Sequence, residues 1–400
     1  MNKHLQYLLI LGCFLPLWAE LITLLLVFIV ISNKSGLIID RKFFHFFIFI
    51  FVISGITIFV NDYSYDKFFQ QACLILIFVT LYYSILTYKN WDLEILFHRY
   101  LTISFYVCMI GILQWIVFYF SGINIFNLNG SLEEIRVTSI IGEPGGLAQI
   151  ILPAVIYYFR KVIKEKNLWN YRALIIIGVF LLTSSAAGYL IFAVYLMHHL
   201  WKMLRFKIFL FLFPILFLLI GLKVITIPDK YEFEVRENDI ATKFSETLDG
   251  ISHLRPAIFE NTNASSYAFL SNLYVSLESD SRILGTGLGT HSESYKKVYK
   301  PGYVLYGLNM EDAYSLGIRI FSELGVLGIF FLLFFIFKNY NSQDEISIAI
   351  FYLFLFVIIR GGNYALYGLI FFAIFYYLRK KEFDYRSLNS YQDQELKFNS

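Results

Sequence analysis

The chain alternates long apolar runs with short polar connections. A membrane-spanning helix needs about 20 mostly apolar residues. Runs of roughly that quality centre on residues 5–31, 43–60, 72–88, 100–120, 145–159, 168–204, 206–227, 314–337, 346–359 and 363–378. A helix suits these runs because it satisfies all of its backbone N–H and C=O groups within one segment, where the bilayer offers no water. The pattern therefore predicts an all-α, polytopic membrane protein.

Basic residues gather in alternate connections between the runs. They form clusters at Lys34/Arg41/Lys42, Lys89/Arg99, Arg160/Lys161/Lys164/Lys166/Arg172, Lys202/Arg205/Lys207, Lys338 and Arg379/Lys380/Lys381. Cytoplasmic connections of membrane proteins are enriched in Lys and Arg, so these clusters predict the cytoplasmic side. The opposite short segments carry only Lys3, Lys67, Arg136 and Arg360.

The run over 168–204 lies between two of these clusters, so it must cross the membrane an even number of times. We expect two short helices with a turn near Ser184–Gly188, which places Ser184 and Ser185 at the outer surface; one tilted helix is the alternative. With this turn the chain has about 11 spans (10–12) and a cytoplasmic C-terminus. The N-terminus lies outside if the first run is one span, and inside if Pro16 divides it.

The N-terminus has a basic start, a short apolar core and Ala19 at a position that mimics a signal cleavage site. The apolar segment "LITLLLVFIVI" follows directly, so we expect an uncleaved first membrane helix. The chain then divides into an N-terminal transmembrane bundle, an extracytoplasmic loop domain, C-terminal transmembrane helices and a cytoplasmic tail, at 1–227, 228–313, 314–379 and 380–400. The last 14 residues, "SLNSYQDQELKFNS", are predicted to be disordered.

Composition agrees with a membrane protein. The chain is 58% hydrophobic, 20% aromatic and 16% charged, whereas a soluble protein has about a quarter of its residues charged. The net charge of +3 is too small to indicate a nucleic-acid partner. Cys13, Cys73 and Cys108 lie in apolar runs without metal-ligand spacing, so we expect them to pack in the bundle and predict no metal site.

The stretch "GSLEEIRVTSIIGEPGG" places Arg136 and Glu143 just before an apolar run. Ionisable residues at such depths are costly and usually functional, and these two predict an ion pair. Pro144 fits the first turn of a helix, and the following glycines allow close backbone approach. The helix start carries a partial positive charge, so this mouth suits a phosphate-bearing headgroup. The alternative is a capped helix with a snorkelling arginine.

Two further stretches carry candidate chemistry. In "ILGTGLGTH", the glycines around Gly287 do not fit the dinucleotide-binding spacing, so a turn packed close to the membrane is the plain interpretation. His291, which follows them, is either a structural or a catalytic histidine. In "YGLNMEDAYSLGIRIFSELGVLG", Glu311 or Asp312 is a candidate general base for a sugar hydroxyl; the alternative is that Asp312 caps the next helix.

Taken together, these motifs resemble the O-antigen polymerase and ligase superfamily (Wzy-like). The R-x6-E-P pattern, the T-S-S-x-x-G turn, the "LGTGLGT" loop and the acidic-x-Tyr helix start followed by "ELGVLGIFF" occur in the family's order over roughly 130–340. The resemblance implies a multispanning glycosyltransferase of the GT-C type. It implies a polyprenyl-pyrophosphate-linked oligosaccharide, such as one on undecaprenyl pyrophosphate, as the donor, and neither metal nor cofactor.

The resemblance also implies roles for particular residues. Arginines hold the pyrophosphate while an acidic residue or a histidine activates the acceptor hydroxyl. The catalytic candidates are Glu143, Glu311, Asp312 and His291. The substrate-binding candidates are Arg136, Arg255, Arg282, Arg319, Gly287 and Tyr314.

Two departures from the family pattern matter. The turn reads Ser184-Ser185-Ala186 where the family often has Ser-Arg-Gly, so a phosphate-binding arginine is missing, and Arg255 or Arg282 is the candidate replacement. Glu311-Asp312 occupy the place of a His-Asn pair that is common in ligases, which favours a polymerase.

The resemblance thus implies polymerisation of lipid-linked repeat units into an O-antigen or capsule. The work would take place outside the bacterial cytoplasmic (inner) membrane, with a chain-length regulator as a candidate partner. A ligase of the same superfamily and a polysaccharide flippase are the alternatives. A transporter should show internal repeats and charged or broken helices near the middle of the membrane; the chain has no such repeat, and its long polar loop lies on one side.

Overall fold

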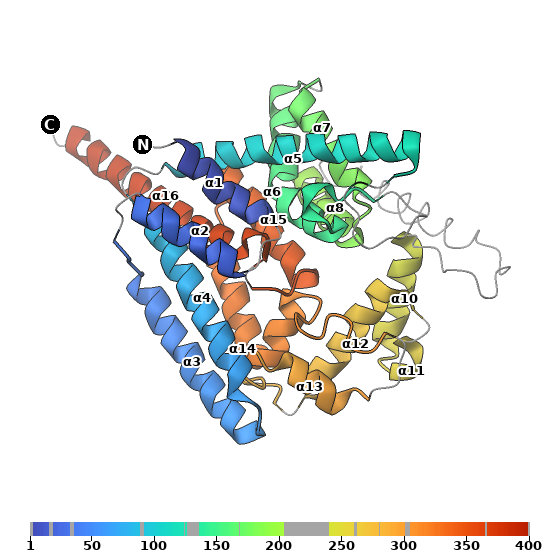
Figure 1. Ribbon diagram of the computed structural model, residues 1–400. Helices are drawn as coiled ribbons and strands as arrows, with labels where there is room; N and C mark the ends of the chain where they lie inside the picture. The colour runs from blue at the N-terminus through green and yellow to red at the C-terminus, as the bar shows by residue number, and fades with distance from the viewer. Residues whose placement is uncertain are drawn as a thin grey trace.

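Helices form every regular element of the computed structural model in the part of the chain that it describes (Figure 1). The described residues are 3–15, 19–32, 36–88, 92–123, 125, 136–167, 169–203, 240–259, 262–279, 281–300, 305–364 and 366–398. The apolar run at 206–227 and the start of the predicted loop domain lie outside these ranges.

The other apolar runs form the bundle helices. These are α1 (Lys3–Phe14), α2 (Ala19–Ser32), α3 (Arg41–Asn61), α4 (Tyr65–Leu86), α5 (Leu93–Ser121), α6 (Pro144–Glu165), α7 (Tyr171–Leu182), α8 (Ala186–Met203), α14 (Leu316–Lys338), α15 (Glu345–Ile359) and α16 (Leu369–Phe398). Two short 3-10 helices, η1 (Ser139–Ile141) and η2 (Leu366–Gly368), precede α6 and α16. Among the described residues, α3, α4, α5, α6 and α14 are long and apolar enough to cross a membrane. The larger count of about 11 spans stays a prediction.

The apolar runs at 5–31 and 168–204, each of which could form one span or two, are each divided into two helices. The first run divides around Pro16 into α1 and α2, as in the alternative that puts the N-terminus inside. The run at 168–204 divides into α7 and α8, which pack together through Phe180 and Phe192 at 5.8 Å between ring centroids. The break lies at the predicted turn, where Ser185 is buried and lines a cavity covered by other helices.

Segments predicted to be cytoplasmic meet at one end of the bundle. Arg379 of α16 contacts Asp344 at 2.9 Å and Glu94 at 4.0 Å. Lys164 of α6 contacts Glu345 at 3.4 Å. Both chain ends also lie on one side of the molecule (Figure 1). The charge pattern of the sequence therefore identifies a real spatial grouping.

The expected disorder of the last 14 residues is wrong over most of that stretch, because α16 continues to Phe398. The part of α16 just before this stretch has ion pairs between residues four apart: Lys380 lies 2.9 Å from Asp384, and Glu382 contacts Arg386. Such pairs stabilise an exposed helix.

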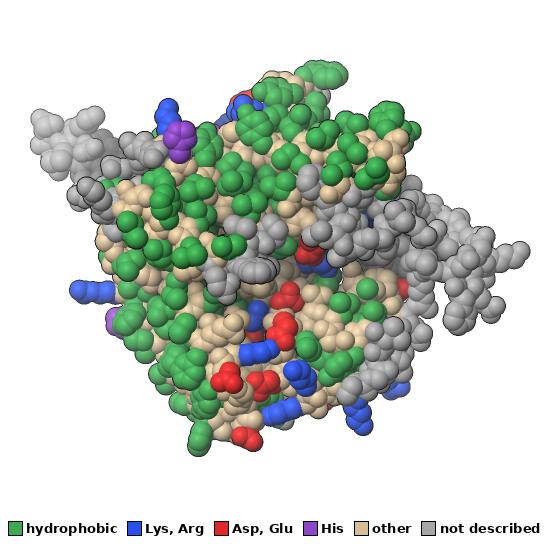
Figure 2. Space-filling model, viewed as in Figure 1, with side chains coloured by type: hydrophobic (Ala, Val, Ile, Leu, Met, Phe, Trp, Pro, Cys, Tyr) green, Lys and Arg blue, Asp and Glu red, His purple; other side chains and the backbone are tan. Residues whose placement is uncertain are grey.

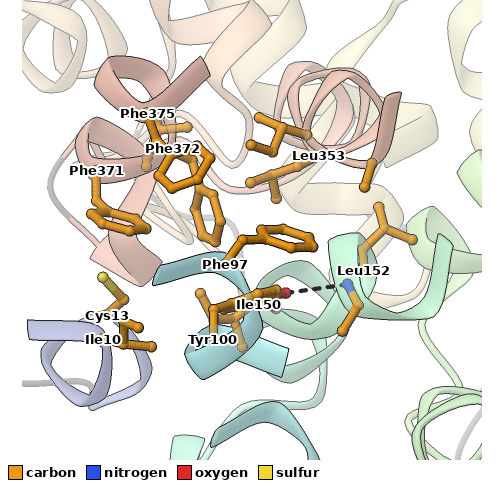
Figure 3. Packing of buried hydrophobic residues seen from close by; sticks show 14 of the residues in the cluster. Ile10, Cys13, Phe97, Tyr100, Ile150, Leu152, Leu353, Phe371, Phe372 and Phe375 are labelled. Carbon is orange, nitrogen blue, oxygen red and sulfur yellow. Dashed lines mark hydrogen bonds between the residues drawn. The ribbon is translucent and has the colours of Figure 1, made fainter. Parts of the chain in front are cut away.

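Tyr100 of α5 links α5 to the backbone of α6 at the centre of the bundle (Figure 3). Pro153 interrupts the backbone ladder of α6 because proline has no N–H. The Tyr100 hydroxyl donates to the Ile150 carbonyl at 2.6 Å and accepts from the Ala154 N–H at 3.3 Å. These two groups would bond each other in an uninterrupted helix. A side chain of α5 thus fills the interruption in α6.

Gly325 breaks α14 in a similar way, with φ 64° and ψ −160°. The loop at 282–287 satisfies the backbone groups beside the break. The Thr286 and Gly287 N–H groups donate to the carbonyls of residues 322 and 323, at 2.9 and 2.8 Å. The N–H groups of residues 326 and 327 donate to the carbonyls of residues 282 and 283, at 2.9 and 3.2 Å. A Cβ at position 325 would lie 2.3 Å from a loop carbonyl oxygen, so glycine is required twice over.

The segment around this loop forms four further helices: α10 (Ile240–Ser252), α11 (Pro256–Phe259), α12 (Ala264–Glu278) and α13 (His291–Val298). They enclose a small apolar core of their own, made of Phe259, Tyr267, Leu270, Val275, Tyr295 and Tyr299. The helices α12 and α13 pack against α14, and α10 contacts α8. This segment covers the end of the bundle away from the termini (Figure 1).

Thiol labelling tests the orientation of the bundle. In a Cys73→Ser background, we expect Arg255→Cys, an exposed position beside α11, to react with a membrane-impermeant maleimide on intact cells. Trp169→Cys, between α6 and α7 and 87% exposed, should react only after the membrane is opened. Reaction of both cysteines on intact cells would contradict the orientation.

Candidate functional site

A cavity of about 660 Å³ lies between the bundle and the covering helices. Its walls come from α8, α10, α12, α14 and α15, and from the start of α6. The charged and hydroxyl groups around it include Arg136, Glu143, Ser184, Tyr314 and Arg360. Figure 2 shows a hollow in the middle of this face, with acidic and basic side chains in and below it.

Glu143 lies directly before α6 and binds two groups from the far end of the chain. Its Oε1 lies 2.8 Å from Nη2 of Arg360, and its Oε2 accepts a hydrogen bond of 3.2 Å from the Tyr367 hydroxyl. The expected pair between Arg136 and Glu143 is therefore wrong. The Glu143 carboxylate is half exposed and faces the cavity.

Arg136 instead binds the end of α7. It donates from Nε to the Thr183 carbonyl at 3.2 Å and from Nη2 to the Ser184 carbonyl at 3.0 Å. The last carbonyls of a helix have no partner within the helix and carry partial negative charge, so they attract a guanidinium. Arg136 thus brings a positive charge to the turn after α7.

Arg360 completes the charged side of the cavity. Its guanidinium carbon lies 4.5 Å from the centroid of the Tyr314 ring. Burial disfavours its charge, but Tyr314 and Glu143 outweigh burial and raise the pKa of Arg360 above its usual value, so the group stays cationic.

The two glycines at the start of α6 make room for this arrangement. A Cβ on Gly145 would lie 2.8 Å from Nε of Arg360, and one on Gly146 would lie 2.4 Å from the Tyr367 ring. The predicted close backbone approach is confirmed. The approaching groups are protein side chains, which hold Arg360 beside the first N–H groups of the helix.

A smaller cavity of about 60 Å³ adjoins the first and shares Glu143, Tyr314 and Arg360 with it. Asp312 and Gln149 add polar groups here. Asp312 Oδ1 accepts from the Tyr314 N–H at 3.1 Å, and the side chain of Ser315 caps α14 in the place proposed for Asp312.

Arg319, expected to bind substrate, lies in a buried ion pair. Its Nε is 2.9 Å from Oε1 of Glu323, and the two side chains are 4% and 0% exposed. Arg319 also donates to the Gly362 carbonyl at 3.1 Å, and Tyr364 donates to Glu323 at 2.9 Å. Neither charged residue lines the cavity. The pair joins α14 to the turn after α15.

His291 is buried between helices and does not line the cavity. Its Nδ1 lies 2.8 Å from the Ser322 hydroxyl, and its Nε2 lies 2.8 Å from Oδ1 of Asn272. Burial, and secondarily Arg319, lowers the pKa of His291 to about 3. Gly287 packs too closely on Ile58 of α3 to admit a side chain, which agrees with the plain interpretation of the glycine-rich turn.

The remaining candidates lie on the surface. Glu311 is exposed and contacts Lys67. Arg255 and Arg282 are exposed and line neither of these cavities, so neither replaces the missing arginine of the turn. The Arg282 backbone is used in the loop that satisfies the break in α14.

Arg360, Tyr367 and Gln149 line the smaller cavity although the sequence does not predict them as site residues. The sequence identifies Arg360 only as one of the few basic residues on the outer side. The signal available was "RGGNY" directly after a short apolar run, with an arginine at the end of a helix and two glycines behind it. Such a residue is costly at that depth and requires a partner.

Removing one member of the buried pair should destabilise the protein strongly. Glu323→Gln leaves the Arg319 charge without its counter-ion, which costs about 3 to 5 kcal/mol for a buried pair. Glu311→Gln removes the same charge from an exposed pair and should cost less than about 1 kcal/mol. Thermal unfolding of the purified variants measures the difference; equal melting temperatures would contradict the assignment.

The neutral His291 predicts a loss of stability in acid. Its pKa in the fold lies below the unfolded value of about 6.5, so the unfolded chain gains a proton first as the pH falls. At pH 5 this costs about 2 kcal/mol relative to pH 7.5. The melting temperature of the wild type should fall more between these pH values than that of His291→Gln; parallel curves would contradict the prediction.

Among the described residues, no group of three or more His, Cys, Asp or Glu side chains is placed to hold a metal ion. Comparisons of the chain with known protein families, with curated proteins and with solved structures find no match.

Proposed function

We propose that this protein polymerises polyprenyl-pyrophosphate-linked oligosaccharide repeat units into a surface polysaccharide. The observation that carries the proposal is the cavity itself: its lining holds two guanidinium groups and a helix start, and most of the rest is apolar. A diphosphate joined to a long hydrocarbon chain has the same division between a doubly charged part and an apolar part.

The apolar part of the cavity comes from helices of the bundle. Its walls include Ala187, Leu190, Ile318, Phe321, Ile329 and Ile359. These side chains lie on α8, α14 and α15, so the apolar wall continues from the charged groups along the bundle. A lipid chain can leave the diphosphate along this wall without exposure to water.

The charged part suits a diphosphate. Arg136 and Arg360 come from different segments and both line the cavity. A guanidinium donates two parallel hydrogen bonds to phosphate oxygens. The start of α6, at Gly145, adds backbone N–H groups and the positive end of the helix dipole. These positive groups would stabilise the charge that develops as the diphosphate departs.

Glu143 is the group that we propose as the general base. It pairs with Arg360 at 2.8 Å. An arriving diphosphate competes for Arg360 and releases the carboxylate toward the acceptor. The acceptor hydroxyl then gives its proton to Glu143, and its oxygen forms a bond to the anomeric carbon of the donor. The bond from that carbon to the diphosphate oxygen breaks, and the diphosphate leaves with the electron pair.

The smaller cavity is the proposed place for the acceptor sugar. Asp312, Asn309 and Gln149 line it next to Glu143. Amide and carboxylate groups bind sugar hydroxyls as acceptors and donors. In this arrangement the acceptor hydroxyl lies between the base and the donor, so positioning supplies much of the rate. The site lies at the end of the bundle opposite the basic clusters, which supports a reaction outside the cytoplasmic membrane.

Reconstitution with a synthetic polyprenyl-diphosphate-linked oligosaccharide tests the proposal. In proteoliposomes, the wild type should lengthen the glycan, as a ladder on a gel. Arg360→Ala and Arg136→Ala should each slow elongation by about 100-fold or more, the usual effect of removing one group that stabilises the leaving charge. Arg282→Ala, an exposed arginine outside the cavity, is the matched control and should elongate normally.

Three outcomes would overturn the proposal. Normal elongation by folded Arg360→Ala and Arg136→Ala would remove the cavity as the site. A single transfer to another acceptor, without a ladder, would indicate a ligase. Movement of the intact lipid-linked unit across the bilayer, with no new glycosidic bond, would indicate a transporter.

A further inference from the structure

A third cavity, of about 510 Å³, lies between α3, α4, α14 and α16. We call it the lateral groove. It shares no lining residue with the proposed active-site cavity, and apolar side chains make up nearly all of its walls. The inference drawn from it is independent of the proposed function.

The lateral groove exists because α3 packs only loosely against the bundle along its first half. The buried residues of α3 are Ser54, Thr57 and Ile58, all in the half near the covering helices. At the other end, the ring of Phe43 lies 4.8 Å from that of Tyr377 in α16. Between these contacts α3 buries no residue, which leaves the groove along the inner half of the helix.

The inner end of the lateral groove is basic. Lys42 at the start of α3 and Lys338 at the end of α14 both line it. Among the described residues, no carboxylate lies within 4.0 Å of either ammonium group. Asp40, the nearest acidic residue in sequence, accepts a hydrogen bond of 3.1 Å from Tyr377 and lies 3.9 Å from Lys381. The positive charge at this end therefore exceeds the negative charge.

We propose that the lateral groove binds one anionic diacyl phospholipid. Its phosphate lies between Lys42 and Lys338, and its acyl chains pack along the wall formed by the rings of Phe46 and Phe331, which contact each other edge to face with centroids 5.3 Å apart. Gly328 lies about 15 Å along α14 from Lys338, which matches the depth of about 15 Å for one leaflet of hydrocarbon. The groove thus has the length, the apolar walls and the charged end that such a lipid requires.

The proposal commits to an anionic lipid of the inner leaflet for two reasons. The lysines lie at the end of the bundle where the basic clusters meet, the side that faces anionic lipid headgroups in a bacterial membrane. A zwitterionic headgroup also carries a cation, which two lysines would repel. The bound lipid would fill the space beside α3 and hold this helix against α14.

Native mass spectrometry of the full chain in mild detergent tests the proposal, with phosphatidylglycerol and phosphatidylcholine of equal chain length as probes. The wild type should retain one phosphatidylglycerol in preference to phosphatidylcholine. Lys42→Ala with Lys338→Ala should weaken phosphatidylglycerol binding about 30-fold, since each lysine near a lipid phosphate contributes about a factor of five. Lys161→Ala with Lys166→Ala removes the same charge from the same end outside the groove and should bind as the wild type does.

A photoactivatable phosphatidylglycerol gives a second measurement, and it should crosslink to peptides covering 43–51 and 331–339. Equal retention of both lipids, equal losses in the two double variants, or crosslinks confined to other helices would each overturn the proposal. A dimer that protects the groove without lipid would show that a second copy of the chain is the occupant, and would overturn it as well.

Discussion

Backbone polar groups inside an apolar bundle must find partners, and this constraint organises the molecule. Pro153 and Gly325 each interrupt a helix, and each interruption is filled by another segment: the Tyr100 hydroxyl in α6, and the loop at 282–287 in α14. Arg136 meets the same need at the end of α7, where it binds the last carbonyls. The breaks in the helices are thus the places where distant parts of the chain are joined.

The proposed active site depends on these joints. The ion pair of Arg319 and Glu323 lies just before the break in α14, and Arg319 binds the carbonyl of Gly362. That bond holds the turn after α15, which carries Arg360 to the start of α6. Arg319, predicted to bind substrate, therefore holds the site together from outside it, and Arg360, which lines the cavity, is positioned through the turn that Arg319 binds.

The sequence predicts the helices well because apolar length alone determines them in a bilayer. It also places the breaks near Pro16 and Ser184, where proline and small polar residues end a helix. The sequence does not predict which groups the charged side chains pair with. Arg136 lies close to Glu143 in sequence, but the actual partner, Arg360, is 217 residues away, and no periodicity carries that information. The helical C-terminal segment was missed because its composition is polar throughout.

The junction at Gly325 also constrains how such a chain can diverge. Four backbone groups of the loop at 282–287 form hydrogen bonds with four backbone groups of α14. The loop backbone can approach Gly325 this closely only because glycine has no side chain. An insertion in the loop, or any larger residue at the glycine, would unpair several of these groups at once. The loop at 282–287 and the part of α14 around Gly325 are therefore expected to change together during evolution. A tolerated substitution in one should be accompanied by a substitution in the other.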